Sequence, residues 1–341
     1  MRYPEFLQPG QTIGYVAPSY GTAIEPYRTA FLNALDKFEK LGFGKDLGPN
    51  VYKNEGIGIS STPEDCGREL TEYYVSARNH ALISVGGGEL MCEDLPYVDF
   101  ERIRAARPKW YMGYSDNTNF TFLSTTLCDT AALYAPCAAS FGMEPWHPAV
   151  QDAFDLLTGR KTFVESYDLW EKESLKDPEN PFAPYNVTEP NLMRFAEWDG
   201  KPLQGRLLGG CLDCLINLCG TRFDRVREFT ERYKNDGILW FLEACDLNVF
   251  SIRRALWELR EAGWFTTARG FLIGRPLVMG QKFLGLDQYE AVLGILEDFN
   301  VPILMDLDIG HLPPMMPLVS GSLALVSRTD AGKLRIAFDF S

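Results

Sequence analysis

The chain has 341 residues, 46% of them hydrophobic and 13% aromatic, which is enough for two domains with sizeable cores. Its formal net charge of -13 argues against nucleic-acid and anionic-membrane partners, because the protein would be repelled by their phosphates. The first residues contain no apolar signal segment, and no apolar run is long enough to span a membrane, so we expect a cytoplasmic protein.

The first third of the chain alternates short apolar runs with amphipathic ones. This pattern predicts strands at 11–18, 81–85 and 109–112, a strand or extended loop at 51–59, and helices at 26–41, 62–79, 90–95, 100–106 and 120–127. Strands that alternate with helices indicate a parallel sheet with helices on its faces. Ligands of such sheets bind at the carboxyl ends of strands, and both Gly86-Gly87-Gly88 and Ser115 lie at such ends.

Ser115 stands alone in a stretch that reads as strand, sharp turn and helix. Such a turn exposes a hydroxyl beside the free N–H groups of a helix start, which is the geometry that an attacking serine needs. Helix capping is the alternative interpretation, because Ser, Asp and Asn are the preferred capping residues. The stretch also departs from G-x-S-x-G, since Asn117 stands where the second glycine would be.

The triple glycine lacks the G-x-G-x-x-G spacing of a dinucleotide-binding loop. One interpretation is a turn that needs positive φ angles. The other is that a backbone without side chains lets a substrate carbonyl approach an N–H group closely.

Residues 143–204 differ in character, because they are rich in proline and contain a charged run at 171–177. Trp170, Tyr185 and Trp198 are interleaved with these residues. The region is interpreted as a linker between domains with a long excursion, and loops of this length are usually functional or disordered.

The second half repeats the alternation. A helix is expected up to about residue 219 and others at 250–262 and 289–299, with strands at 237–243, 270–276 and 302–308 and a closing hairpin at 323–327 and 334–340. Glu243 ends one of these strands and His311 follows another, as Ser115 does in the first half. Together they match a serine nucleophile, a histidine base and an acid that orients the histidine. The alternatives are that Glu243 caps a helix or pairs with an arginine, and that His311 is a surface loop residue.

The positions of the other histidines and of the cysteines indicate packing or surface roles and not catalytic or metal-binding ones. His80 and His147 lie in turns, and the eight cysteines are scattered as expected of buried thiols in the cytosol. Cys211 and Cys214 have the spacing of half a zinc site, but no second pair follows. We therefore predict no metal site.

Several segments in this order and spacing resemble the LD-carboxypeptidase and microcin-immunity family of serine peptidases. They are the glycines before Leu95-Pro-Tyr-Val-Asp99, then Gly113-Tyr-Ser-Asp116, Gly209-Gly-Cys-Leu212 with Leu218-Cys-Gly-Thr221, the strand ending at Glu243, Gly274-Arg-Pro276, and Gly310-His311 followed by prolines. The resemblance covers essentially the whole chain.

The resemblance implies an α/β protein with an N-terminal parallel-sheet, Rossmann-like domain (1–150), a linker and active-site loop (151–204) and a smaller β-rich α/β domain (205–341). It implies that Ser115 is the nucleophile, that His311 is the general base and acid, and that Glu243 orients His311. The N–H groups of Asp116 and of Gly86 or Gly87 would form the oxyanion hole. No metal or organic cofactor is implied, and a homodimer is expected.

Two substrate classes are compatible with the resemblance: a murein tetrapeptide that loses its terminal D-Ala, or a peptide-nucleotide antibiotic whose aspartyl amide is cleaved. The long insertion resembles the second class, in which Trp170 or Tyr185 would stack on a base; the alternative is that these rings pack the loop down. A different class of function, a catalytically inactive peptide-binding or sensing protein on the same fold, is disfavoured because Ser115, Glu243 and His311 are all present.

Overall fold

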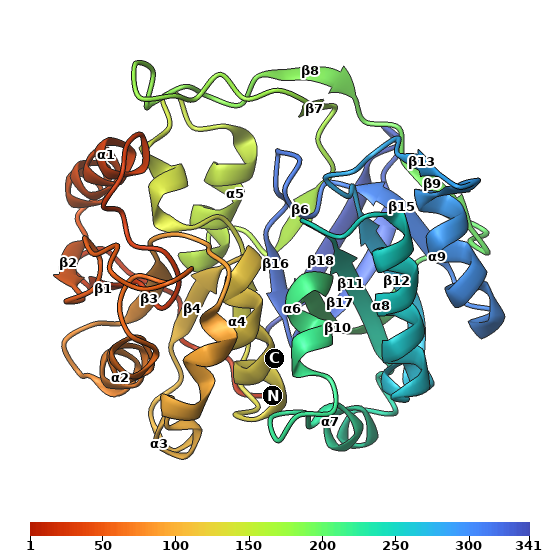
Figure 1. The fold of residues 1–341 in the computed structure, drawn as a ribbon, viewed down its shortest axis with the longest axis horizontal. Helices are drawn as coiled ribbons and strands as arrows, with labels where there is room; N and C mark the ends of the chain where they lie inside the picture. Colours follow the sequence, from red (N-terminus) through yellow and green to blue (C-terminus); the bar gives the residue numbers. More distant parts are fainter.

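The apolar runs form the strands of two mainly parallel sheets, and the amphipathic runs form the helices that pack around them (Figure 1). This computed structural model describes residues 1–341 and confirms the predicted α/β fold class. The two chain ends lie close together at one end of the molecule (Figure 1).

The first sheet has six strands in the order β16-β5-β4-β3-β1-β2. Their bounds are β1 Thr12–Val16, β2 Gly44–Leu47, β3 Ala81–Ser84, β4 Trp110–Gly113, β5 Ala132–Tyr134 and β16 Leu318–Ser320. All neighbours pair in parallel except β16, which runs antiparallel to β5. A strand from the C-terminal part of the chain therefore completes the N-terminal sheet.

The second sheet has eight strands in the order β6-β18-β17-β10-β11-β12-β15-β9. Their bounds are β6 Phe163–Glu165, β9 Arg194–Ala196, β10 Leu203–Cys211, β11 Ile238–Glu243, β12 Ala268–Gly274, β15 Ile303–Leu307, β17 Leu323–Arg328 and β18 Leu334–Asp339. The four central strands from β10 to β15 are parallel, and the strands that flank them are antiparallel.

Nine α-helices pack on these sheets. They are α1 Tyr27–Lys40, α2 Pro63–Val75, α3 Phe100–Ala105, α4 Thr118–Thr126, α5 Pro148–Leu157, α6 Leu212–Leu218, α7 Val226–Arg232, α8 Val249–Glu261 and α9 Gln288–Leu296. The start of α2 is as predicted, with Pro63 in the first turn and the Thr62 hydroxyl accepting a hydrogen bond from the N–H of Asp65. None of these helices combines the length and the apolar character needed to cross a membrane.

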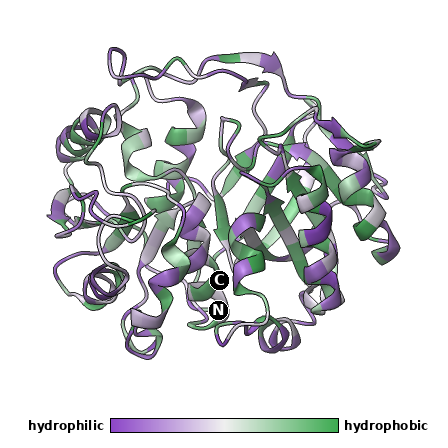
Figure 2. Ribbon diagram, in the orientation of Figure 1, coloured by the Kyte–Doolittle hydropathy of each residue, from purple (hydrophilic) through white to green (hydrophobic).

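One large apolar core joins the two sheets, since buried residues such as Ile83 and Met112 of the first belong to the same cluster as Leu207 and Phe241 of the second. Figure 2 shows the same division, with hydrophobic residues concentrated in the strands and hydrophilic ones on the outer helices. This shared core holds the carboxyl ends of both sets of parallel strands in one rigid frame.

Residues 151–204 contain more regular structure than the sequence indicated. The region includes most of α5, both edge strands of the second sheet (β6 and β9), and a two-stranded ribbon of β7 (Leu169–Glu171) and β8 (Val187–Pro190) along the top of Figure 1. The segment thus spans from one edge of the second sheet to the other.

Two local predictions were wrong in part or in full. Of the two alternatives for residues 51–59, the strand was wrong, because these residues form turns and bends without a strand. The edge strand β2 lies before them at Gly44–Leu47, where exposed and half-buried residues give no apolar run. The run at 90–95 forms two short 3-10 helices, Met91–Glu93 and Leu95–Tyr97, and not one α-helix. A proline at the second position of the latter removes an N–H that a continuous helix would use.

Candidate active site

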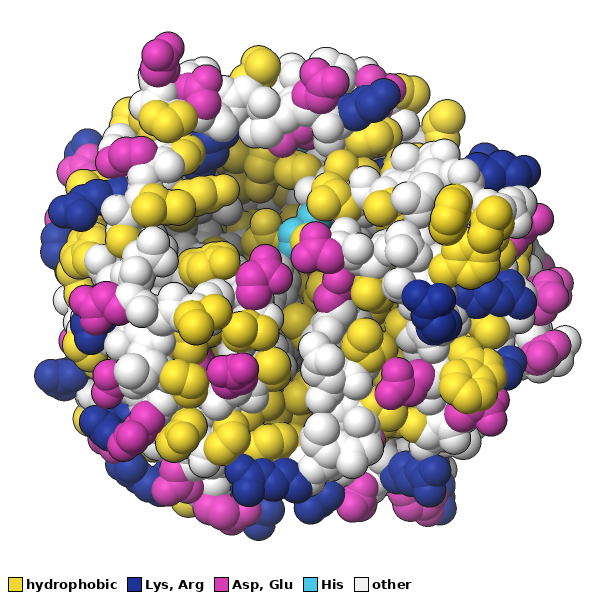
Figure 3. All heavy atoms as spheres, viewed as in Figure 1, with side chains coloured by type: hydrophobic (Ala, Val, Ile, Leu, Met, Phe, Trp, Pro, Cys, Tyr) yellow, Lys and Arg dark blue, Asp and Glu magenta, His cyan; other side chains and the backbone are white.

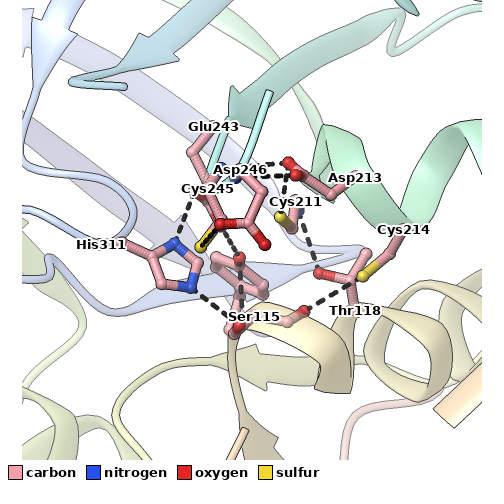
Figure 4. A network of polar contacts seen from close by, with 10 residues as sticks. Ser115, Thr118, Cys211, Asp213, Cys214, Glu243, Cys245, Asp246 and His311 are labelled. Atoms are coloured by element: carbon pink, nitrogen blue, oxygen red, sulfur yellow. Dashed lines mark hydrogen bonds and ion pairs between the residues drawn. The ribbon is translucent and has the colours of Figure 1, made fainter. Parts of the chain in front are cut away.

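Three side chains from distant parts of the chain form a continuous hydrogen-bonded row (Figure 4). Ser115 follows β4, Glu243 is the last residue of β11, and His311 lies in the loop after β15. The Ser115 Oγ is 2.7 Å from His311 Nε2, and His311 Nδ1 is 2.9 Å from Glu243 Oε2. The structure therefore brings together the three residues that the sequence singled out.

Ser115 is held in a sharp turn at the carboxyl end of β4. Its φ of 64° lies in the left-handed region that non-glycine residues seldom adopt, and a short 3-10 helix begins at this residue. Neither this helix nor α4, which follows it, has a side-chain cap, and the Ser115 hydroxyl contacts His311. The capping interpretation of Ser115 is therefore wrong.

His311 is fixed on both nitrogens and on its ring face. Besides its two hydrogen bonds, the imidazole packs against the ring of Tyr114, with ring centroids 5.2 Å apart. The preceding Gly310 has a φ of 109°, and a Cβ at that position would lie 2.7 Å from Glu243 Oε2. Only glycine both accepts this backbone conformation and lets the carboxylate reach the imidazole.

Glu243 is buried, with a side chain that is 0% exposed, yet it has partners for its charge. Burial alone would raise the pKa of this carboxyl group, but His311, the Tyr134 hydroxyl and the Cys211 thiol outweigh it and lower the pKa. It neither caps α8, whose cap is Asn248, nor pairs with an arginine. Glu243 is thus a buried anion beside the imidazole.

The pKa of His311 is shifted in the opposite direction, upward. Burial disfavours the charged imidazole, but the Glu243 carboxylate and the neighbouring Cys245 side chain raise the pKa of His311 well above its usual value. In the neutral form, an Nδ1–H that donates to Glu243 leaves Nε2 free to accept the Ser115 proton.

Tyr134 is a site residue that the sequence reasoning missed. Its hydroxyl donates to Glu243 Oε1 at 2.7 Å and accepts from the N–H of Ser115 at 3.2 Å, so it joins the serine backbone to the carboxylate. Tyr134 ends β5, a three-residue strand that was not predicted. A short apolar run directly after α4 was the only signal for it.

The glycine loop after β3 lies against Ser115. None of the three glycines has a positive φ, so the prediction of a turn that needs such angles was wrong. The carbonyl of Gly86 accepts from Ser84 Oγ and Asn117 Nδ2, that of Gly87 accepts from the N–H of Tyr20, and the N–H of Gly87 forms no hydrogen bond within the protein. A Cβ on Gly87 would lie 3.3 Å from Ser115 Oγ, so the absence of a side chain keeps space open beside the hydroxyl.

Asp116 is anchored by its side chain. One carboxylate oxygen accepts from Ser19 Oγ at 2.6 Å and from the N–H of Met91 at 3.0 Å, and the other accepts from Asn119 Nδ2 at 3.0 Å. Nothing in the sequence connects these residues, which come from three separate segments of the chain. Their bonds fix the turn that presents Ser115.

The two aromatic residues proposed for substrate stacking are engaged by the protein itself. Trp170 is 8% exposed, donates its indole N–H to Pro190 and lies over the guanidinium of Arg275. Tyr185 is half-buried and packs against His147, with ring centroids 5.3 Å apart. Their role in substrate binding stays a prediction.

The remaining histidines have structural partners. His80 accepts a hydrogen bond from the N–H of Thr12, and His147 caps α5 by accepting from the N–H of Ala149. No group of three or more His, Cys, Asp or Glu side chains has an arrangement that could hold a metal ion.

A cavity of about 210 Å³ opens beside Ser115 and His311. In Figure 3 the histidine lies in a hollow of the surface with acidic side chains next to it. A second cavity of about 480 Å³ is lined by Gly86 and Gly87 together with Tyr20, Tyr27 and Tyr114. The hydroxyl thus faces space that a small peptide can enter.

Comparison with known proteins agrees with this architecture. The family model for the N-terminal domain of LD-carboxypeptidases matches residues 13–135, and that for the C-terminal domain matches residues 204–326. The probable murein peptide carboxypeptidase of Bacillus subtilis is 26% identical over 96% of this chain and 92% of its own length. The microcin C7 self-immunity protein MccF of Escherichia coli is 25% identical over 92% of this chain and 90% of its own length.

Solved structures share the fold over nearly the whole chain. An MccF-like protein from Bacillus anthracis has a TM-score of 0.83 at 20% identity, covering 99% of this chain and 100% of its own. MccF in complex with aspartyl sulfamoyl adenosine has a TM-score of 0.80 at 21% identity, covering 99% of this chain and 98% of its own.

Proposed function

The chain belongs to the LD-carboxypeptidase family that includes the MccF-like proteins, and on that premise we propose that it is a serine hydrolase that cleaves a terminal amide of a small peptide. An unbroken row of hydrogen bonds carries this proposal: it runs from the Ser115 hydroxyl through both nitrogens of His311 to the Glu243 carboxylate. This is the arrangement by which a buried acid and an imidazole activate a serine.

In the first half of the reaction, His311 Nε2 takes the proton of Ser115 as Oγ attacks the scissile carbonyl carbon. Glu243 stabilises the imidazolium that forms and keeps Nε2 directed at the serine. The N–H groups of Gly87 and of Asp116, the residue after the nucleophile, donate hydrogen bonds that stabilise the negative charge on the carbonyl oxygen, with Gly86 shaping the loop.

His311 then gives its proton to the leaving amine, the amide bond breaks, and an acyl-serine remains. A water molecule, deprotonated by His311, hydrolyses this ester and restores the hydroxyl. Every proton in this cycle passes through the imidazole, so neither a metal nor an organic cofactor is needed.

The substrate is either a murein peptide or a peptide-nucleotide, as the names of the two relatives and the ligand of the MccF structure suggest. Wild-type protein and the Ser115→Ala variant should be incubated with a murein tetrapeptide ending in D-Ala and with an aspartyl-adenylate amide analogue, and the products followed by mass spectrometry. We expect one of the two to be cleaved by the wild type alone. Cleavage by Ser115→Ala at the wild-type rate would refute the mechanism.

Failure of the wild type to cut either substrate, with tight peptide binding, would favour a binding or sensing protein. We further propose that the protein is a homodimer and is cytoplasmic, and light scattering of the purified protein tests the oligomeric state.

A further inference from the structure

Arg275 and Asp308 form an ion pair in the interior of the protein. Their side chains are 1% and 0% exposed, and Nη2 of the arginine donates to Oδ1 of the aspartate. Neither residue takes part in the proposed mechanism. Because taking two charges out of water costs about as much as their attraction returns, a buried ion pair is weak evidence of stabilisation. The informative property of this pair is therefore the geometry that it fixes.

The ion pair lies at the base of the loop that carries His311. Arg275 directly follows β12 and Asp308 directly follows the neighbouring strand β15, whereas the glutamate that His311 contacts ends β11, on the far side of β12. The chain after Asp308 must therefore cross over the end of β12 to bring the imidazole to its partner. The crossing is tight, because a Cβ on Gly274 would lie 2.0 Å from the carbonyl oxygen of Ile309.

The histidine loop is closed on the same two residues. The carbonyl of Asp308 accepts a hydrogen bond at 2.6 Å from the N–H of Met316, beyond His311 in the chain. The guanidinium of Arg275 also donates through Nη1 to the carbonyl of Asp306 at 2.9 Å. The ion pair thus holds the end of β15 and both ends of the loop that presents the imidazole.

The same pair holds a second segment, residues 167–191, which we call the strap. It contains the ribbon of β7 and β8 along the top of Figure 1. Asp308 Oδ2 accepts from the N–H of Tyr167 at 2.8 Å and from Nδ2 of Asn191 at 2.9 Å. Asn191 Oδ1 in turn accepts from Arg275 Nη1 at 3.3 Å. Both ends of the strap are therefore bonded to the ion pair.

Two residues within the strap add contacts of their own. The ring of Trp170 lies against the guanidinium of Arg275, with 5.5 Å from its centroid to Cζ. The N–H of Glu171 donates at 2.6 Å to the carbonyl of Pro313, which follows His311 in the loop. The strap, the ion pair and the histidine loop are thus joined by direct contacts into one unit.

We propose that Arg275 and Asp308 are positioning residues which, together with the strap, hold His311 in hydrogen-bonding reach of Ser115. The proposal rests on the proposed function, because a catalytic imidazole is what needs such placement. A misplacement of about 1 Å in a catalytic group costs about 100-fold in rate. Loss of the ion pair should therefore slow the chemical step more than it weakens substrate binding.

Two variants test this role. Replacing one partner alone would leave a buried charge unpaired and risk unfolding. The first variant is therefore Arg275→Met with Asp308→Asn, which buries no charge and keeps an acceptor for the N–H of Tyr167. The second is Asn191→Ala, which keeps the ion pair and removes the amide through which the end of the strap contacts it.

The matched control is another shielded ion pair of the same sheet, removed by Arg206→Met with Asp236→Asn. Arg206 is 8% exposed, and its Nη2 is 2.6 Å from Asp236 Oδ2. This pair is remote from the site, because Arg206 lies beside the first residue of β11 and Glu243 is the last residue of that strand. The control should lose stability and keep wild-type kcat.

Steady-state kinetics on the cleaved peptide provide the first measurement. We expect kcat to be about 10- to 100-fold lower in the double variant of Arg275 and Asp308, and about 3- to 10-fold lower in Asn191→Ala. KM should change less than kcat in both variants. This division would separate the placement of a catalytic group from a loss of substrate contacts.

The second measurement reports the position of the imidazole without any turnover. The chain contains only three histidines, so ¹⁵N-histidine labelling resolves the two ring nitrogens of His311 by NMR, with His311→Gln to assign them. Their chemical shifts report the bonds to Glu243 and Ser115. We expect both signals to move in the double variant of Arg275 and Asp308 and to stay in place in the control. A purely structural role would lower the melting temperature without moving them in the folded protein.

Wild-type kcat and unmoved His311 signals in the folded double variant of Arg275 and Asp308 would overturn the proposal, as would an equal loss of kcat in the control. If that double variant does not fold, the same two measurements on Asn191→Ala decide. If the wild type hydrolyses no peptide, the proposed function fails, while the His311 signals still show whether the ion pair places the imidazole.

Discussion

Tyr134 is the buried link between the nucleophile and the acid, and its hydroxyl can be removed almost without changing shape. Tyr134→Phe deletes one oxygen atom from a residue that is 0% exposed. It leaves Glu243 Oε1 without its donor and the N–H of Ser115 without its acceptor. Both losses are at the site, and no cavity larger than one oxygen is created.

The cost follows from the two bonds. A hydrogen bond to a charged group contributes about 1.5–3 kcal/mol and one between neutral groups about 0.5–1.5 kcal/mol, so we expect a loss of about 2–4 kcal/mol in the free energy of unfolding at neutral pH. Because Glu243 and the Ser115 turn are less firmly held, kcat should fall by about 10- to 100-fold with little change in KM.

The matched control is Tyr74→Phe, since the Tyr74 hydroxyl is also buried and also joins two backbone groups, the N–H and the carbonyl of Lys109, each at 3.3 Å. Urea unfolding and steady-state kinetics on the cleaved peptide should be run on both variants. The control should lose stability, by about 1–2 kcal/mol, while keeping wild-type kcat.

The sign of the pH dependence distinguishes the two variants further. Tyr134 helps to lower the pKa of Glu243, so its stabilisation is present above the unfolded pKa of a glutamate, about 4.3, and is lost as the pH falls through the lower folded pKa. The stability difference between wild type and Tyr134→Phe should therefore narrow in acid. Wild-type kcat in Tyr134→Phe, with a stability loss no larger and no more pH-dependent than that of Tyr74→Phe, would refute this role.

Three further outcomes are expected. Gly87→Ala places a methyl group 3.3 Å from Ser115 Oγ at a backbone angle that alanine accepts. The variant should therefore have a kcat/KM about 10²- to 10³-fold lower than the wild type at an unchanged melting temperature. A kcat/KM equal to that of the wild type would exclude the Gly87 N–H from the oxyanion hole. Catalysis needs neutral His311, and the pKa of His311 is raised, so kcat/KM should rise with pH through an ionisation above about 6.5. Glu243→Gln should slow the reaction and move this ionisation to lower pH. If the ionisation stays where it is in that variant, the titrating group is not His311. Burial raises the pKa of Asp94 to about 9, and neither of its carboxyl oxygens has a hydrogen-bond partner. The Asp94 side chain therefore destabilises the folded state increasingly as the pH rises from about 4 towards 9. Asp94→Asn should stabilise the protein by about 2–4 kcal/mol more at pH 8 than at pH 5 in urea unfolding, and an equal effect at both pH values would contradict this reasoning.

The spacing of apolar residues was sufficient to predict most of the strands whose ends position the site residues. The strands that end near Ser115, Glu243 and His311 are short, apolar and bounded by turn residues, and each was predicted to within two residues at its carboxyl end. Elements that carry no apolar run were missed. Examples are β2, whose residues are half-exposed, and β5, which has only three residues. Helix α5 was hidden by its position in a proline-rich region.

The residues of the candidate site also fall into two groups, those that the sequence identifies and those that it does not. Ser115, Glu243 and His311 could be named because each interrupts or ends an apolar run with a chemically active side chain, which is a local property of the sequence. Tyr134 and Ser19 could not, because they act through partners 109 and 97 positions away. A tyrosine at the end of a strand looks the same in the sequence whether or not a carboxylate faces it.

The sequence by itself determined the alternation of strands and helices, the acidic character of the chain and the three residues that can carry the reaction, since these depend on spacing and residue type. Only the tertiary structure decided that two sheets share a core, that a C-terminal strand completes the N-terminal sheet, and that acidic side chains line the cavity beside the serine. The physical reason is that hydrogen-bond partners, burial and electrostatic fields depend on distances in space, and residues far apart in the chain become neighbours only when the apolar faces of both sheets are buried together.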